Sequence, residues 1–269
     1  MTAGEPIRMG QIEANGMTMA YRESGAGLPV IFLHGAMVSG WMWDRVVALL
    51  GGQYRAIIPD LRGHGFSDNP SGELSYPLFA ADVAAFVAAL RLDAPVLVGW
   101  SMGGFVAIEV SVRHPGTAGA LVAGGVASAI PAEADAAIRE LYAIDVRGAV
   151  DLERFARERP ELVAMMEQSH GPSRWQTLLR QYAAMDDTYR LPEGGQQIWT
   201  AAQLGQIEEP VLIMAADRDE FITLEGAVDT FRHLRHGELA VLPGATHLAP
   251  WERPEIVAAV LTDYLRRVT

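Results

Sequence analysis

Residues 96–107, with the sequence VLVGWSMGGFVA, constrain the fold of this chain more than any other stretch. A short apolar run bounded by Pro95 and Gly99 predicts a buried strand, and helical spacing begins at Met102. A strand that turns directly into a helix strains the residue at the corner, and small neighbours are needed because a Cβ atom would collide with the facing segment. The corner residue is Ser101, in a G-x-S-x-G pattern, so its hydroxyl is expected to project as a nucleophile.

The chain on both sides of this turn alternates between short apolar runs and helical patterns. Strands are predicted at residues 12–22 (a hairpin turning at Asn15-Gly16), 29–33, 54–59, 96–99, 120–126, 210–214 and 238–242. Helices are predicted at residues 43–50, 76–90, 102–113 and 255–267. Such alternation predicts an α/β fold with a mostly parallel sheet.

Between residues 128 and 209 this rhythm breaks. Helical patterns cover residues 131–144, 151–168, 173–186 and 194–202, with no strand between them. Dense charge and single aromatic residues suggest amphipathic helices that pack over another part of the chain. We therefore predict a core made of residues 1–127 and 210–269, with residues 128–209 inserted as a helical cap.

Composition excludes several kinds of chemistry. The 269 residues include no cysteine and no lysine, which excludes thiolate metal sites, cysteine nucleophiles and Schiff-base lysines. A net charge of −12 argues against nucleic acid and anionic membranes as partners. Because no signal peptide or membrane-spanning stretch is visible, we expect a cytoplasmic protein. We also expect that the protein uses no cofactor.

A serine hydroxyl needs a base, and the base needs an orienting acid. Of seven histidines, His247 follows the last predicted strand, where its loop can reach the turn at Ser101. His170 could face a substrate, but a solvated loop histidine is the more probable interpretation. Two carboxylates, Asp217 and Asp219, follow the preceding strand, and we favour Asp219 because it lies deeper in the loop.

When a serine attacks a carbonyl group, the carbonyl oxygen becomes negatively charged, and two hydrogen-bond donors are needed to stabilise this oxyanion. The backbone N–H of Met102 follows the serine, and the N–H of Ala36 lies in the loop after the strand at residues 29–33. We predict these two groups as the oxyanion hole. Candidate substrate-binding residues near the site and in the cap are Met37, Trp100, Trp175, Tyr182 and Trp199.

Five motifs in this order make the chain similar to the α/β-hydrolase superfamily over nearly its whole length. They are His34-Gly35, the stretch from Asp60 to Ser67, the elbow from Gly99 to Gly104, the Asp219 loop and the segment from Pro243 to His247. The resemblance implies an α/β-hydrolase fold with Ser101 as nucleophile, Asp219 as acid and His247 as base. It also implies that Asp60 and His64 are structural.

Individual motifs resemble those of different subgroups of this superfamily. Ser101-Met102 and the stretch from Ser39 to Trp43 resemble cofactor-free haloperoxidases and perhydrolases, from which Ala36 departs, and the elbow also resembles acyl-homoserine lactonases. We predict a serine hydrolase that cleaves a small-molecule carboxylic ester or lactone. The alternatives are a ligand-binding or receptor protein on the same scaffold, and a carbon–carbon hydrolase or perhydrolase using the same triad.

Overall fold

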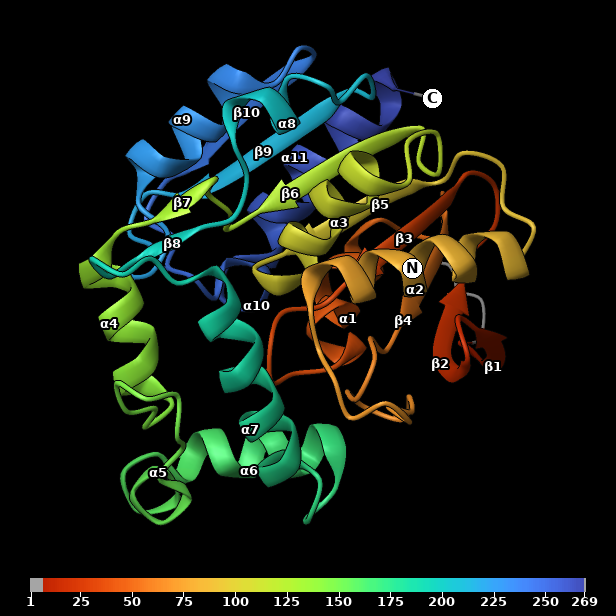
Figure 1. Ribbon diagram of the computed structural model, residues 1–269. Coiled ribbons are helices and arrows are strands. Elements are labelled where there is room, and N and C mark those ends of the chain that lie inside the picture. Colours follow the sequence, from red (N-terminus) through yellow and green to blue (C-terminus); the bar gives the residue numbers. More distant parts are fainter. Residues whose placement is uncertain (1–6, 269) are drawn as a thin grey trace.

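An eight-stranded sheet lies at the centre of the computed structural model, which describes residues 7–268 apart from the side chains of residues 186 and 187 (Figure 1). The strand order is β1-β2-β4-β3-β5-β6-β9-β10; β2 is antiparallel to β1 and β4, and the other neighbours are parallel. The α/β-hydrolase prediction is therefore confirmed. The strands are β1 (Arg8–Ala14), β2 (Met17–Ser24), β3 (Pro29–Leu33), β4 (Arg55–Pro59), β5 (Val96–Trp100), β6 (Ala120–Gly124), β9 (Val211–Ala216) and β10 (Gly237–Leu242).

Helices cover both faces of the sheet, which explains why its central strands are continuous apolar runs. Along β5, Leu97 points into one hydrophobic cluster and Val98 into the other. One face is covered by α2 (Tyr76–Ala89), α3 (Met102–Arg113) and α9 (Leu224–His233). The other is covered by α1 (Asp44–Leu49), α10 (Ala249–Glu252) and α11 (Pro254–Arg267), with the short η1 (Gly40–Trp43) beside α1.

The turn from β5 to α3 is as tight as the glycine pattern predicts. Ser101 has a φ of 53°, in the left-handed region that a non-glycine residue rarely adopts. A Cβ atom on Gly99 would collide with the backbone of Gly103, and one on Gly103 would collide with the backbone of Leu33. Both glycines are needed so that the helix can start directly behind the serine.

The insertion between β6 and β9 differs from its prediction in two places. Pro160 splits the expected helix at residues 151–168 into two, since a proline is tolerated in the first turn but not inside a helix. The predicted helix at residues 194–202 is wrong: Gly194 and Gly195 have φ values of 93° and 77°, and a short strand follows them. The elements are β7 (Ala129–Ile130), α4 (Ala132–Leu141), α5 (Leu152–Glu158), α6 (Pro160–His170), α7 (Trp175–Asp186), η2 (Asp187–Tyr189), β8 (Gln196–Gln197) and α8 (Ala201–Leu204).

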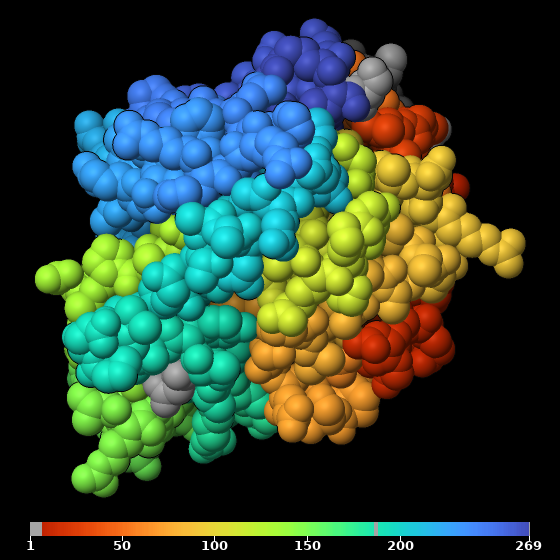
Figure 2. Space-filling view, turned by 45° about the horizontal axis from the view of Figure 1, so that its top comes forward, coloured from red at the N-terminus to blue at the C-terminus, as the bar shows by residue number. Residues whose placement is uncertain are grey.

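Two residues near the α6–α7 connection attach the insertion to loop 60–67, which follows β4. The Arg174 guanidinium donates to the carbonyl oxygens of Gly65 (2.6 Å) and Ser67 (2.8 Å). His170 accepts a hydrogen bond at Nδ1 from the Gly65 N–H (2.9 Å). His170 is therefore buried at a packed contact, and its interpretation as a solvated loop histidine is wrong. Figure 2 shows the green and teal insertion packed closely against the orange part of the core.

Within residues 7–268, no helix has both the length and the apolar character that crossing a lipid bilayer requires.

Candidate active site

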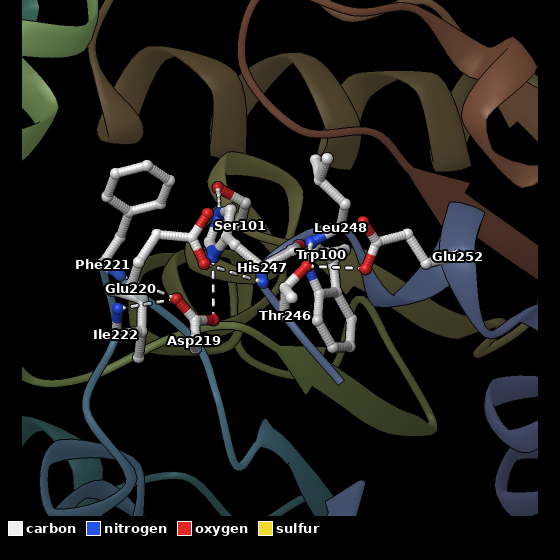
Figure 3. Close-up of polar contacts among 10 residues, drawn as sticks. All are labelled: Trp100, Ser101, Asp219, Glu220, Phe221, Ile222, Thr246, His247, Leu248 and Glu252. Atoms are coloured by element: carbon white, nitrogen blue, oxygen red, sulfur yellow. Dashed lines mark hydrogen bonds and ion pairs between the residues drawn. The ribbon is translucent and has the colours of Figure 1, made fainter. Parts of the chain in front are cut away.

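A chain of hydrogen bonds joins the three side chains that the sequence singles out (Figure 3). Ser101 stands at the β5–α3 turn, and its Oγ lies 2.9 Å from Nε2 of His247. His247 follows β10, and its Nδ1 lies 2.8 Å from Oδ2 of Asp219, in the loop after β9. An ionised carboxylate can only accept, so Nδ1 carries the ring proton and Nε2 is left to accept from the serine hydroxyl.

Asp219 is held rigidly in this chain. Its second oxygen, Oδ1, accepts from the backbone N–H groups of Phe221 (2.9 Å) and Ile222 (2.8 Å), and its side chain is 1% exposed. Asp217 instead accepts from the backbone N–H of Ala245 at 3.2 Å. Of the two carboxylates that the sequence leaves open, Asp219 is therefore the one in contact with the histidine.

Two aromatic residues, Trp100 and Phe221, contact His247. Trp100 donates from Nε1 to the backbone oxygen of His247 at 2.8 Å, which ties the end of β5 to the loop after β10. The edge of the Phe221 ring faces the imidazole, with 5.1 Å between ring centroids. The imidazole therefore has little freedom to turn away from Ser101.

A cavity of about 250 Å³ opens at the serine hydroxyl, just below the usual size range of small-molecule pockets. Ser101 and His247 lie on its wall, together with Ala36 and Met102, the residues predicted to supply the oxyanion donors. Apolar side chains from the insertion form the opposite wall, among them Ile138, Leu141, Leu162, Met165 and Met166.

Two of the five predicted substrate-binding residues, Trp100 and Tyr182, line this cavity. Met37, Trp175 and Trp199 are not among its lining residues. All three are buried in the core instead.

The two tryptophans outside the cavity wall, Trp175 and Trp199, pack against other aromatic rings. Trp199 stacks on Phe105 at 5.4 Å between centroids, and its Nε1 donates to a carboxylate oxygen of Glu109 at 2.7 Å. Trp175 packs against Phe155 at 5.7 Å. Helical spacing gives a core residue and a wall residue the same pattern, so the sequence holds no signal that separates them.

Sequence reasoning missed several wall residues that adjoin the predicted acid and base. Glu220 and Phe221 follow Asp219, and Leu248 follows His247. Their position could have been inferred, because a loop that delivers a catalytic side chain also places that residue's neighbours around the site. Trp41 and Trp251, whose rings meet edge to face at 4.8 Å, line the same cavity.

Comparison with known proteins agrees with this fold. A model of the alpha/beta hydrolase family matches residues 30–260. The chain belongs to the alpha/beta hydrolase family. This hydrolase is 27% identical to a protein of Synechocystis provisionally named non-heme chloroperoxidase, over 97% of this chain and 99% of that one.

Two further similarities are to a curated hydrolase and to a solved structure. It is 26% identical to the 2-hydroxy-6-oxo-6-(2'-aminophenyl)hexa-2,4-dienoic acid hydrolase of Metapseudomonas resinovorans, over 95% of this chain and 90% of that one. It shares the fold of a thermophilic esterase from Thermogutta terrifontis, with a TM-score of 0.76 and 23% identity over 97% and 99% of the two chains.

Proposed function

We propose that this α/β hydrolase cleaves small-molecule carboxylic esters or lactones through an acyl-enzyme on Ser101. The observation that carries the proposal is the continuous hydrogen-bond chain from Ser101 through His247 to Asp219. A serine hydroxyl is a weak nucleophile until a base takes its proton, and the neutral Nε2 of His247 lies within hydrogen-bond distance of that proton.

The reaction has two halves. Ser101 Oγ attacks the carbonyl carbon while His247 takes its proton, and Asp219 stabilises the imidazolium that forms. The backbone N–H groups of Ala36 and Met102 donate to the oxyanion, and each such donor is worth about 10²–10³ in kcat. His247 gives its proton to the leaving alcohol, then activates water, which releases the acid and restores the serine.

The insertion supplies the wall opposite the serine, which supports a role as the lid of the substrate site. We keep residues 128–209 as the proposed cap, and residues 1–127 and 210–269 as the proposed core. Specificity for the substrate then depends on both parts, because the cavity is lined from each of them.

A carbon–carbon hydrolase is the second candidate, because one relative acts on a dienoic acid, as its name states. A substrate with a carboxylate is normally held by a cation. Among the described residues no arginine lines the cavity, and the sequence has no lysine. The lack of a cationic side chain on the described cavity wall favours ester or lactone cleavage over cleavage of a dienoic acid.

The decisive experiment measures release of p-nitrophenolate from p-nitrophenyl hexanoate by the wild type and by Ser101→Ala. We expect turnover by the wild type and a loss of at least about 10³-fold in the variant. A fluorophosphonate should label the wild type once, at Ser101. Absence of turnover on esters and lactones, or full activity of Ser101→Ala, would overturn the proposal, and labelling without turnover would favour a ligand-binding protein.

A further inference from the structure

The charges around the cavity bear on the class of substrate. Glu220 lies on the cavity wall, and its Oε2 accepts from the backbone N–H of His247 at 3.3 Å. Figure 3 shows this side chain extending from the β9 loop to the backbone of His247. Apart from His247 itself, every other lining residue among those described is uncharged. The carboxylates beside the reacting atoms are therefore those of Glu220 and Asp219, and no arginine or lysine among the described lining residues balances a further negative charge.

The rest of the described lining carries no cation: its polar side chains include Tyr76, Tyr142, Tyr182 and Gln196, whose hydroxyl and amide groups are uncharged. Leu162, Met165 and Met166 on α6 and Leu141 on α4 are all apolar. The amide of Gln196, which also lines the cavity, already donates to Asp135 at 2.9 Å. An ionised group moved from water against such walls loses hydration without a compensating opposite charge, which is far more costly than for a methyl group of similar size.

We propose that the substrates are uncharged esters or lactones whose acyl part carries no carboxylate. This inference rests on the proposed function. The apolar wall favours an aliphatic or aromatic acyl group. Glu220 adds repulsion against an anion, so this selectivity includes a penalty against the wrong substrate as well as attraction for the right one. The released acid is itself an anion with no cation to hold it, so it should leave readily.

Three p-nitrophenyl esters of similar acyl length test this inference: the hexanoate, the adipate half-ester and the methyl adipate. The adipate replaces the terminal methyl of the hexanoate by a carboxylate, and the methyl ester removes that charge while keeping its polarity. Rates with Ser101→Ala are subtracted as background. We expect kcat/KM for the adipate to be at least about 100-fold below that for the hexanoate, with methyl adipate within about tenfold of the hexanoate.

A cation placed in the wall should reverse the preference. Leu162 is only partly buried, so an arginine there can keep its head group hydrated. Leu162→Arg should raise the adipate-to-hexanoate ratio of kcat/KM at least about tenfold, while the matched control Leu162→Gln should leave it within about twofold. Glu220→Gln should raise the same ratio severalfold, since an exposed carboxylate is partly screened; Glu225→Gln, an exposed carboxylate on α9 outside the cavity, should not.

The outcomes separate this inference from the proposed function. Equal kcat/KM for adipate and hexanoate, or an equally poor methyl adipate, overturns the inference and leaves ester hydrolysis intact. An unchanged ratio in Leu162→Arg also overturns it, provided that the variant retains hexanoate turnover. Failure to cleave any of the three esters overturns the proposed function itself.

Discussion

Asp217 and Asp219 are only two positions apart in the sequence, yet their carboxylates have different surroundings. Asp219 is enclosed, accepts two backbone N–H groups and contacts the imidazole, whereas Asp217 contacts the backbone of Ala245. An anion at Asp219 holds the imidazole in one tautomer and stabilises its protonated form. An anion at Asp217 can do neither, because it does not contact the imidazole.

Replacement of Asp219 by Asn should therefore lower kcat on p-nitrophenyl hexanoate by about 10³–10⁴, because the amide favours the wrong tautomer of His247. The matched control, Asp217→Asn, should stay within about twofold of the wild type. Steady-state kinetics at pH 7.5 give both values. Comparable losses in the two variants would mean that the acid has been misassigned.

Loop 60–67 and the α6–α7 connection meet at a row of three histidines. His64 lies between the other two, with 5.0 Å to the ring centroid of His34 and 5.5 Å to that of His170. Burial lowers the pKa of all three, and that of His170 falls to about 4. The charged groups that act on His170 are His34 and Arg174, which lower its pKa, and Asp60, which raises it.

The fold should therefore lose stability in mild acid. A histidine whose pKa is about 6.5 when unfolded and about 4 when folded binds more protons in the unfolded state between these values. Lowering the pH through this window reduces the free energy of unfolding, by about 3 kcal/mol through His170 alone. Urea denaturation at several pH values between 7 and 4 measures the loss.

His170→Asn provides the control for this prediction. The asparagine side-chain oxygen can accept from the Gly65 N–H in place of Nδ1, and it does not titrate. The variant should show a smaller fall in stability between pH 6.5 and 4, while the carboxylates and the other two histidines continue to contribute. An unaltered fall would show that His170 does not take part.

A buried ion pair connects three parts of the molecule that lie far apart in the sequence. Arg62, in loop 60–67, donates from Nε to Asp82 on α2 at 2.7 Å, and both side chains are almost fully enclosed. Asn15, in the turn between β1 and β2, donates to the same carboxylate at 2.7 Å. The antiparallel edge of the sheet, the loop and the helix are thus held by one carboxylate.

Breaking this pair from either side should be more harmful than removing it whole. Arg62→Met and Asp82→Leu should each lower the free energy of unfolding by about 3–5 kcal/mol, because each leaves an unpaired buried charge. The double variant should be less destabilised than the sum of the two. Urea titrations of all four proteins give the coupling, and simple additivity would contradict the prediction.

The sequence allows more of the sheet and of the serine site to be predicted than of the cavity. Apolar strand runs, the glycines around Ser101 and the chain order of serine, acid and base each follow from a local steric or topological requirement. Whether Trp199 faces the cavity or the core depends on how the insertion packs, which no local pattern records. Residues 194–197 are a different case, since Gly194-Gly195 is a turn signal that the sequence does record and that the expected helix passed over.

β7 and β8 lie antiparallel, with Ala129 opposite Gln197, so the insertion leaves and re-enters the core at nearly the same point (Figure 1). Most of the helical segment between them can therefore change in length without pulling on the sheet, since its ends stay side by side. We therefore expect the helical segment between β7 and β8 to be replaceable by another of different length. Exchange of the helices between these two short strands, in evolution or by grafting, should change which substrates reach Ser101.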